Sequence, residues 1–226
     1  MTWIDNLPRI IVIVGHYGSG KTNIAVNLAL SLKQKHDNVM IVDYDVVNPY
    51  YRTADSVELL WEAGINTIIP EYANTNVEIP AVAGINAIFS DKEAKVIIDV
   101  GGEDVGALAL GVIEKKLRNE DCTMLCVINK KRPVIDTPEK VLDMIKAIEI
   151  SSGMMRTEGL INNTHLGEFT DYEVVANSYE YTKESERICG IPTVFTASAL
   201  EDAENEKLSS LFGSVYPIKI YTKKFE

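Results

Sequence analysis

An eight-residue stretch near the start of the chain constrains its fold more than any other feature. Residues 15–22 read Gly-His-Tyr-Gly-Ser-Gly-Lys-Thr and fit the pattern G-x-x-x-x-G-K-[ST]. The β-branched run Ile10–Val14 comes before the stretch, and a helical pattern with Ile24 and Leu28 on one face follows it. A strand, a glycine-rich turn and a helix in this order predict a loop that wraps a polyphosphate.

Most residues of this loop have a physical role in binding phosphate. The candidate nucleotide-binding residues are Gly15, Tyr17, Gly18, Ser19, Gly20, Lys21 and Thr22. The three glycines permit backbone dihedrals that bring amide groups close to phosphate oxygens. Lys21 supplies a point charge for the β- and γ-phosphates. Thr22 offers a hydroxyl to Mg²⁺, a cation that prefers oxygen ligands.

Short apolar runs alternate with longer helical patterns along the rest of the chain. Strands are expected at residues 10–14, 39–42, 96–98, 124–128, 159–161 and 193–195, with a further edge strand at 217–224, and helices at 22–35, 55–62, 105–117, 139–150 and 172–188. Continuous apolar strands separated by amphipathic helices predict an α/β fold, with a mostly parallel sheet flanked by helices on both faces. The length suits one nucleotide-binding domain over residues 1–226, in the three-layer α/β/α form of P-loop NTPases.

Acidic residues directly follow two of the expected strands. Asp43 and Asp45 follow the second strand, and Asp99 follows the third, with Gly102 close behind. In a parallel sheet, ligands bind beyond the carboxyl ends of the strands. Hydrolysis of a nucleoside triphosphate needs a positioned water and a metal, and carboxylates can hold both. Asp43 alone is more simply a turn cap, whereas Asp45 and Asp99 together favour a chemical role.

Three segments carry a resemblance to a known class. Residues 13–22, 41–45 and 96–102 together resemble the MinD/ParA-like P-loop ATPases of the SIMIBI class, which includes the nitrogenase iron protein and cobyrinic acid synthetase-type domains. Order and spacing match over about the first half of the chain, and the second half matches only in its strand–helix rhythm. The resemblance implies ATP and Mg²⁺ as ligands.

The resemblance also implies roles for individual residues. Lys21 would contact the β- and γ-phosphates, Asp45 would orient the attacking water, and Asp99 would support Mg²⁺ through a water molecule. Thr22, Asp45 and Asp99 are therefore the candidate metal residues, and Lys21, Asp45 and Asp99 the candidate catalytic ones. Gly102 would be the glycine of the second switch loop.

The base is expected near an asparagine that follows a late strand. Asn162 or Asn163 matches this position, and a loop asparagine that caps a turn explains either one equally well. The run Asn129-Lys130-Lys131-Arg132 is similar to the guanine motif N-K-x-D but ends in arginine, so the acceptor for guanine is missing. This departure favours ATP over GTP, and the basic run itself is predicted to be a solvated loop.

A second departure concerns charge at the phosphate loop. Much of the class carries a lysine where this chain has His16, and that lysine reaches across a dimer to the partner's nucleotide. A neutral imidazole cannot supply a permanent charge near pH 7. Arg52 is one candidate for the missing cation, although a solvated arginine is the simpler interpretation.

Composition excludes several functions. The formal net charge is −11 and the isoelectric point is about 4.8, which disfavours direct binding of nucleic acid or of an anionic membrane. The sequence has no apolar run long enough to span a membrane and no signal-peptide pattern at its start. Cys122, Cys126 and Cys189 form an odd set without CxxC spacing, so a cytoplasmic location without disulfides is expected.

Three functions fit these observations. The first is a Mg²⁺-dependent ATPase that acts as a nucleotide-driven switch for a partner protein or cargo, in a nucleotide-dependent homodimer. The alternative is an ATP-dependent synthetase of the dethiobiotin or cobyrinic acid type. The third is a binding module without hydrolysis, which Asp45 disfavours. The region Asn74–Phe89 is a candidate surface for a partner or substrate, and ordinary packing explains it more simply.

Overall fold

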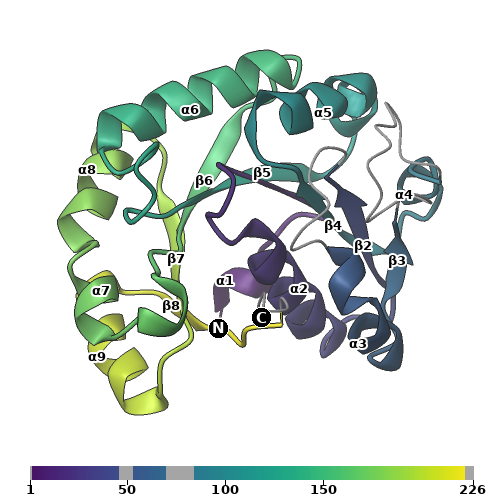
Figure 1. Cartoon of the computed structure of the whole chain (residues 1–226). Coiled ribbons are helices and arrows are strands. Elements are labelled where there is room, and N and C mark those ends of the chain that lie inside the picture. The colour runs from purple at the N-terminus through teal and green to yellow at the C-terminus, as the bar shows by residue number, and fades with distance from the viewer. Residues whose placement is uncertain (1, 46–52, 70–83, 222–226) are drawn as a thin grey trace.

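A sheet of eight strands runs through the computed structural model, which describes residues 2–45, 53–69 and 84–221. The strands are β1 (Ile10–Val14), β2 (Val39–Tyr44), β3 (Asn66–Ile68), β4 (Lys95–Val100), β5 (Cys122–Ile128), β6 (Thr157–Asn162), β7 (Thr193–Ser198) and β8 (Val215–Pro217). Their order is β3-β2-β4-β1-β5-β6-β7-β8, and every neighbouring pair is parallel (Figure 1).

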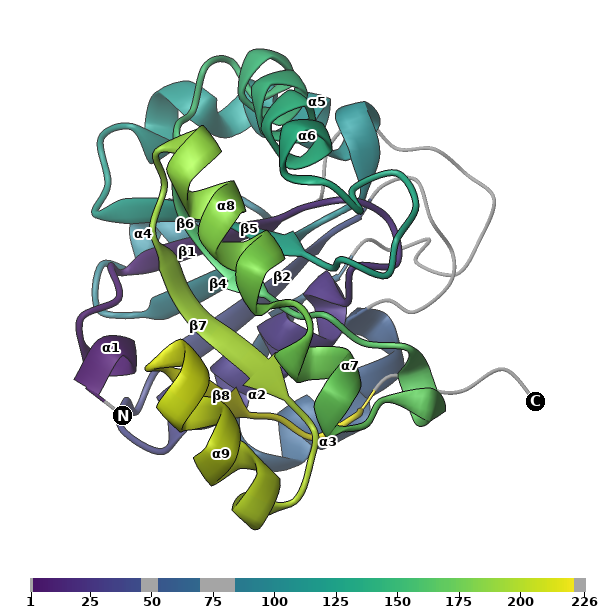
Figure 2. The ribbon, with the colours of Figure 1, turned by 90° about the vertical axis from the view of Figure 1, so that its left-hand side faces the viewer.

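Helices cover both faces of this sheet. They are α1 (Thr2–Asp5), α2 (Lys21–Lys33), α3 (Val57–Glu62), α4 (Ala87–Ser90), α5 (Glu103–Leu117), α6 (Pro138–Ser151), α7 (Tyr172–Ala176), α8 (Tyr179–Cys189) and α9 (Asp202–Phe212), with 3-10 turns η1 (Thr53–Ser56) and η2 (Gly167–Phe169). Figure 2 shows α5, α6 and α8 on one side of the sheet and α2 and α3 on the other. The predicted three-layer α/β/α fold is therefore confirmed.

The side chains of β1 divide the core into two parts. Ile10, Val12 and Val14 pack in the cluster that includes α5 and α6, whereas Ile11 and Ile13 pack in the cluster that includes α2. All five residues are buried. Because successive side chains of a strand point to opposite faces, a strand covered on both sides is apolar at every position. No helix in the described residues has the length and apolar character of a membrane span.

Some elements differ from the prediction. The segment 172–188, expected as one helix, is two helices that meet at Ser178, whose buried hydroxyl donates to the carbonyl of Val175 at 2.6 Å. The last strand lies at Val215–Pro217 and shares only Pro217 with the expected range 217–224, so the predicted edge strand is wrong for residues 218–221. Four elements had no prediction, namely β3, α1, α4 and α9. The first three span only three or four residues, too few for a period to show.

The segment that follows β8 lies along α2, the helix that begins at the phosphate loop. The side-chain amides of Asn23 and Asn27 both donate to the carbonyl of Lys219, at 2.9 and 2.8 Å. In return, the Lys219 amide donates to Asn27 and the Tyr221 amide to Asn23, at 2.9 and 2.8 Å. Two asparagines thus pair with this segment as a neighbouring strand would, and they fix the first turns of α2.

Candidate nucleotide site

The phosphate loop connects β1 to α2 at the carboxyl edge of the sheet (Figure 1). Gly15, Gly18 and Gly20 have φ values of +138°, +72° and +90°, a region that L side chains rarely adopt. A Cβ atom at Gly15 would lie 2.4 Å from the carbonyl oxygen of Val127, and one at Gly20 would lie 2.2 Å from Nδ2 of Asn163. Conformation and space both require glycine at position 15, where the obstacle is backbone, and the positive φ favours glycine at position 20.

Substituting Gly15 with alanine should lower the free energy of unfolding by about 3 kcal/mol, through backbone strain and the clash with β5. Denaturant unfolding followed by circular dichroism measures this. Gly190→Ala is the control, because Gly190 also has a positive φ, +68°, but nothing lies within 4 Å of its added Cβ. Equal losses in the two variants would contradict the steric part of the argument.

The N-terminus of α2 is open to an anion. Its N-cap is Gly20, and because glycine has no side chain, no side-chain cap satisfies the first-turn amides. Unsatisfied amides and the positive end of the helix dipole together favour negative charge. The buried side chain of Lys21 folds back over the loop, and its Nζ donates to the carbonyl of His16 at 3.2 Å. The loop therefore gathers positive charge and amide donors in one place.

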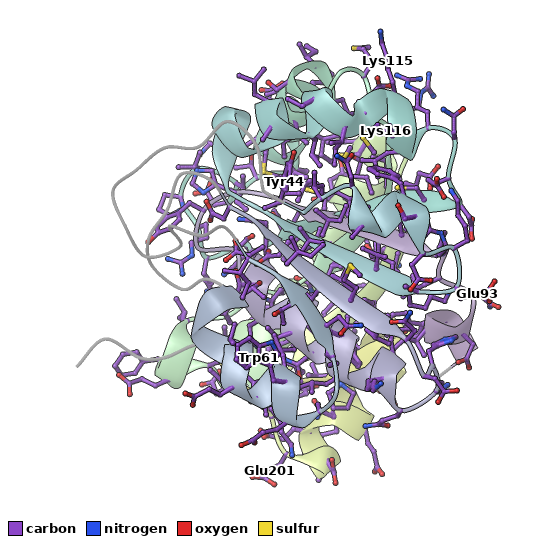
Figure 3. The ribbon with its side chains drawn as sticks, turned by 90° about the vertical axis from the view of Figure 1, so that its right-hand side faces the viewer. Tyr44, Trp61, Glu93, Lys115, Lys116 and Glu201 are labelled. Atoms are coloured by element: carbon purple, nitrogen blue, oxygen red, sulfur yellow. The ribbon has the colours of Figure 1, made fainter. Side chains whose placement is uncertain are left out.

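Strands β2 and β4 bring the acidic residues together. Their register places Asp43 beside Asp99. Oδ1 of Asp43 accepts from the backbone amide of Asp45 at 3.1 Å. Asp43 therefore caps this turn, in agreement with the simpler interpretation of its sequence position. Tyr44 lies between Asp43 and Asp45 in the sequence, and Figure 3 shows its side chain beneath α5. The Tyr44 hydroxyl donates to the Ala109 carbonyl at 3.1 Å.

The turn that contains Asp45 lies against the turn at Gly101 and Gly102, and the latter lies against the phosphate loop. A Cβ atom at Gly101 would be 2.5 Å from Oδ1 of Asp45, and one at Gly102 would be 2.8 Å from the backbone nitrogen of Tyr17. The structure thus brings Asp45, Gly102 and the loop together. Only glycine leaves room for these approaches.

Asp99 is buried beside the phosphate loop. The hydroxyl of Thr53 donates to its Oδ2 at 2.9 Å. Burial raises the pKa of Asp99 to about 6, against the lowering effects of the Lys21 charge and of the Thr22 and Thr53 hydroxyls. The other oxygen, Oδ1, is buried and has no hydrogen-bond partner among the described residues. A buried carboxylate oxygen in this position is open to a ligand.

These residues fit Mg²⁺. Within the described ranges, no three His, Cys, Asp or Glu side chains gather closely enough to hold a metal by themselves. Mg²⁺ does not need such a cage, because it keeps several waters and binds through one or two carboxylates and the substrate phosphates. The hydroxyl of Thr22 and Oδ1 of Asp99 match this partial set, and Asp45 lies close by at Gly101.

The two candidate asparagines lie in different surroundings. Asn162 is fully buried, its Nδ2 donates to the Ser178 hydroxyl at 2.9 Å, and its Oδ1 accepts from the Thr164 hydroxyl at 2.8 Å. The fold itself uses this side chain, so the assignment of Asn162 to the nucleotide is corrected. Asn163 instead reaches the phosphate loop, where its Nδ2 donates to the carbonyl of Ser19 at 2.7 Å.

The basic run after β5 belongs partly to the site. Asn129 is fully buried, and its Oδ1 accepts from the amides of Lys131 and His165 at 3.0 and 3.2 Å. Nε of Arg132 donates to the carbonyl of Gly18 at 2.7 Å. The prediction of a solvated loop is therefore wrong for Asn129 and Arg132, although Lys131 is exposed. The available signal was the position of the run directly after a strand of the same sheet edge.

His165 contributes a second unexpected group. Its Nδ1 accepts from the Gly167 amide at 3.2 Å, so the neutral ring carries its proton on Nε2. Nε2 is buried without a hydrogen-bond partner among the described residues, and it would lie 3.4 Å from a Cβ at Gly20. Burial, together with the positive charge of Arg132, lowers the pKa of His165 to about 4. The ring is therefore a neutral donor near pH 7.

Two predicted features fall partly or wholly outside the described residues. Arg52 is one of them, and so are residues 74–83 of the region Asn74–Phe89. At the described end of that region, Phe89 is half-buried and packs against the core cluster that includes α5. Packing, the simpler interpretation, therefore accounts for Phe89.

A parallel sheet in this order, with a glycine-rich loop between β1 and α2 and acidic residues at the ends of β2 and β4, defines a P-loop NTPase fold. Comparison with known proteins agrees. The family model described as Zeta toxin matches residues 4–63, a minority of the chain that includes the loop.

Curated relatives match part of the chain. The signal recognition particle 54 kDa protein of Sulfurisphaera tokodaii is 35% identical over 99 residues, and that of Sulfolobus acidocaldarius is 37% identical over 99 residues. Each match covers 42% of this chain and 21% of the relative. The chain thus spans about a fifth of the length of these relatives.

Solved structures share the fold. The signal recognition particle 54 kDa protein of Aeropyrum pernix in complex with GDP has a TM-score of 0.55 and 22% identity, over 84% of this chain and 41% of that one. The cell division protein FtsY of Thermotoga maritima has a TM-score of 0.59 and 19% identity, over 90% and 69%. The predicted class of P-loop NTPases is confirmed. The narrower resemblance to MinD and ParA is not supported, because the reported matches are to signal recognition particle 54 kDa proteins and to FtsY.

Proposed function

We propose that this chain is a Mg²⁺-dependent nucleoside triphosphate hydrolase that acts as a nucleotide-driven switch for a partner protein or cargo. One observation carries the proposal. Three segments far apart in sequence, the phosphate loop, the turn at Asp45 and the turn at Gly101 and Gly102, are in contact at one edge of the sheet. Such an arrangement places phosphate binding, water positioning and a movable backbone within one site.

The residues divide the chemistry among themselves. The amides of the phosphate loop and the Lys21 charge bind the β- and γ-phosphates. Thr22 and Asp99 would hold Mg²⁺, which would neutralise charge on the phosphate oxygens when bound. Asp45, whose amide is fixed by Asp43, orients the attacking water towards the γ-phosphate. Loss of that phosphate removes a contact from the Gly102 amide and releases the turn.

A surface near the site supports a nucleotide-dependent partner. Helix α5 begins at Glu103, directly after Gly102, so a movement of that turn moves the start of the helix. Leu108 and Val112, one turn apart on α5, are 63% and 68% exposed. Exposed apolar side chains on a helix next to the Gly102 turn suit a protein partner that recognises one nucleotide state. A second copy of this chain is one such partner.

For the base we propose ATP, with GTP as the alternative. ATP is supported by the run that ends in Arg132, which supplies no acceptor for the N1–H and amino group of guanine. GTP is supported by similarity to a 54 kDa protein solved with GDP. Competition of unlabelled ATP and GTP against one fluorescent nucleotide separates the two. An affinity for GTP higher than for ATP would replace the first assignment.

Asp45→Ala tests the hydrolytic part of the proposal. Without the carboxylate that orients water, turnover should fall by about 100-fold, whereas nucleotide affinity should stay within about threefold, because the phosphate contacts remain. Steady-state release of nucleoside diphosphate and calorimetric titration measure the two quantities. Asp143→Ala, an exposed position on α6, is the control. Unchanged turnover in Asp45→Ala would contradict the assigned role, and diphosphate release only with an added carboxylate substrate would indicate a synthetase.

A further inference from the structure

Arg132 differs from the described arginines that form ion pairs. Those pairs are Arg9 with Glu120, Arg118 with Glu114, and Arg187 with Glu184. Arg132 is half-buried, and no carboxylate of the described residues lies within ion-pair distance of it. A half-buried guanidinium without a counter-ion is costly, since a buried charge is normally paired. The chain has a net charge of −11 and therefore many carboxylates, yet none in the described residues pairs with Arg132.

The position of Arg132 indicates what that anion is. Nε donates to the carbonyl of Gly18 at 2.7 Å, and a Cβ at Gly18 would lie 3.0 to 3.2 Å from Cζ, Nε and Nη2. The guanidinium thus lies against the phosphate loop itself. Its Nη groups make no hydrogen bond within the described residues, so most of its donors remain open. A guanidinium is suited to binding phosphate through two such donors at once.

The neighbouring ring leaves this charge uncompensated. His165 faces the same loop near Gly20 and is neutral at pH 7, so it offers Arg132 neither a counter-ion nor a second positive charge. Lys21 approaches the loop from the start of α2 and has its Nζ on the carbonyl of His16. Two cations therefore flank one loop, at Gly18 and at His16.

We propose that Arg132 binds the phosphates of the nucleotide directly and supplies a permanent positive charge to the site from within the same chain. This inference rests on the proposed nucleotide binding and adds a phosphate-contacting residue to it. The hydrogen bond to Gly18 positions the guanidinium before the nucleotide arrives. The contribution of Arg132 therefore increases with the number of phosphates on the ligand and decreases with salt.

The test compares Arg132→Gln with Arg132→Lys in the full chain. Gln keeps an N–H donor but loses the charge, whereas Lys keeps the charge. Lys131→Gln is the matched control, since it removes the same charge from the exposed neighbouring residue. Calorimetry or fluorescence titration gives the affinity for nucleoside tri- and monophosphate at low and high salt, and thermal unfolding shows that each variant is folded.

Arg132→Gln should weaken triphosphate binding by about 10- to 100-fold and monophosphate binding by less than about threefold. Arg132→Lys should recover at least part of the loss, and Lys131→Gln should bind as the unmodified protein does. Equal losses for the two ligands, or equal affinities of the Gln and Lys variants, would overturn the proposal and leave Arg132 as a support for the loop. If the unmodified protein bound no triphosphate, the proposed function itself would fail.

Discussion

Lys21→Ala is expected to weaken nucleoside triphosphate binding by about 100-fold or more, which corresponds to about 3 kcal/mol. The Lys21 side chain is only 8% exposed and is held over the loop by the His16 carbonyl, so its charge meets the phosphates with little solvent screening. No other residue of the loop carries a permanent charge. Isothermal calorimetry with the full chain and a Mg²⁺-bound triphosphate measures the change.

Lys33→Ala provides the control for this loss. Lys33 is the last residue of the same helix, at the end opposite to the loop, and its Nζ donates to the carbonyl of Asp37 at 2.6 Å. Its removal should leave nucleotide affinity unchanged within about twofold. If Lys21→Ala bound the triphosphate as tightly as Lys33→Ala, the phosphate loop would not be the nucleotide site.

Asp99→Asn is expected to lower the rate of hydrolysis strongly and to stabilise the ligand-free protein. Burial raises the pKa of Asp99 from its ordinary 3.8 to about 6, so the folded protein binds more protons than the unfolded chain between these two values. The stabilising contribution of the protonated group is full below the lower value and is lost as the pH rises to about 6. Above that, the ionised group costs on the order of 3 kcal/mol.

Asparagine removes this cost and still accepts the Thr53 hydrogen bond. The free energy of unfolding should therefore rise by about 1 to 3 kcal/mol near pH 8 and hardly change near pH 4, while turnover falls by about 100-fold or more. Denaturant titrations at both pH values and diphosphate release measure these effects. Asp143→Asn, at an exposed position, should change neither. A variant that is less stable at the higher pH would contradict the assigned cost of burial.

The phosphate loop and its acidic neighbours could be predicted because local chemistry determines them. Residues 15–22 must contain glycines to bend back on themselves, and Asp45 and Asp99 follow strands whose apolar side chains are visible in the sequence. The choice between Asn162 and Asn163 could not be made in the same way. These residues are adjacent, and the direction of each side chain depends on the residue at which β6 ends. Because β6 ends at Asn162, that side chain contacts Ser178 and the Asn163 side chain contacts the phosphate loop.

Arg132 and His165 were beyond prediction for a different reason. Both lie in loops, where no hydrophobic period indicates which way a side chain points. Their neighbours at Gly18 and Gly20 are more than a hundred residues away along the chain. The family resemblance was limited by the same physics. The segments that suggested MinD and ParA are those that phosphate binding constrains in any P-loop NTPase, so they could predict the wider class and not the narrower one.

The missing Cβ atoms at Gly101 and Gly102 have a mechanical consequence. A side chain between two loops can absorb a displacement by rotating about its own bonds, but here backbone lies directly against Tyr17 and against Asp45. At Gly102 the nearest atoms are the backbone nitrogen and Cα of Tyr17, and at Gly101 the carboxylate and Cα of Asp45 lie equally close, so we expect a displacement of one loop to displace the next. Because the Tyr44 hydroxyl is bonded to Ala109, helix α5 receives the displacement of both acidic loops at once.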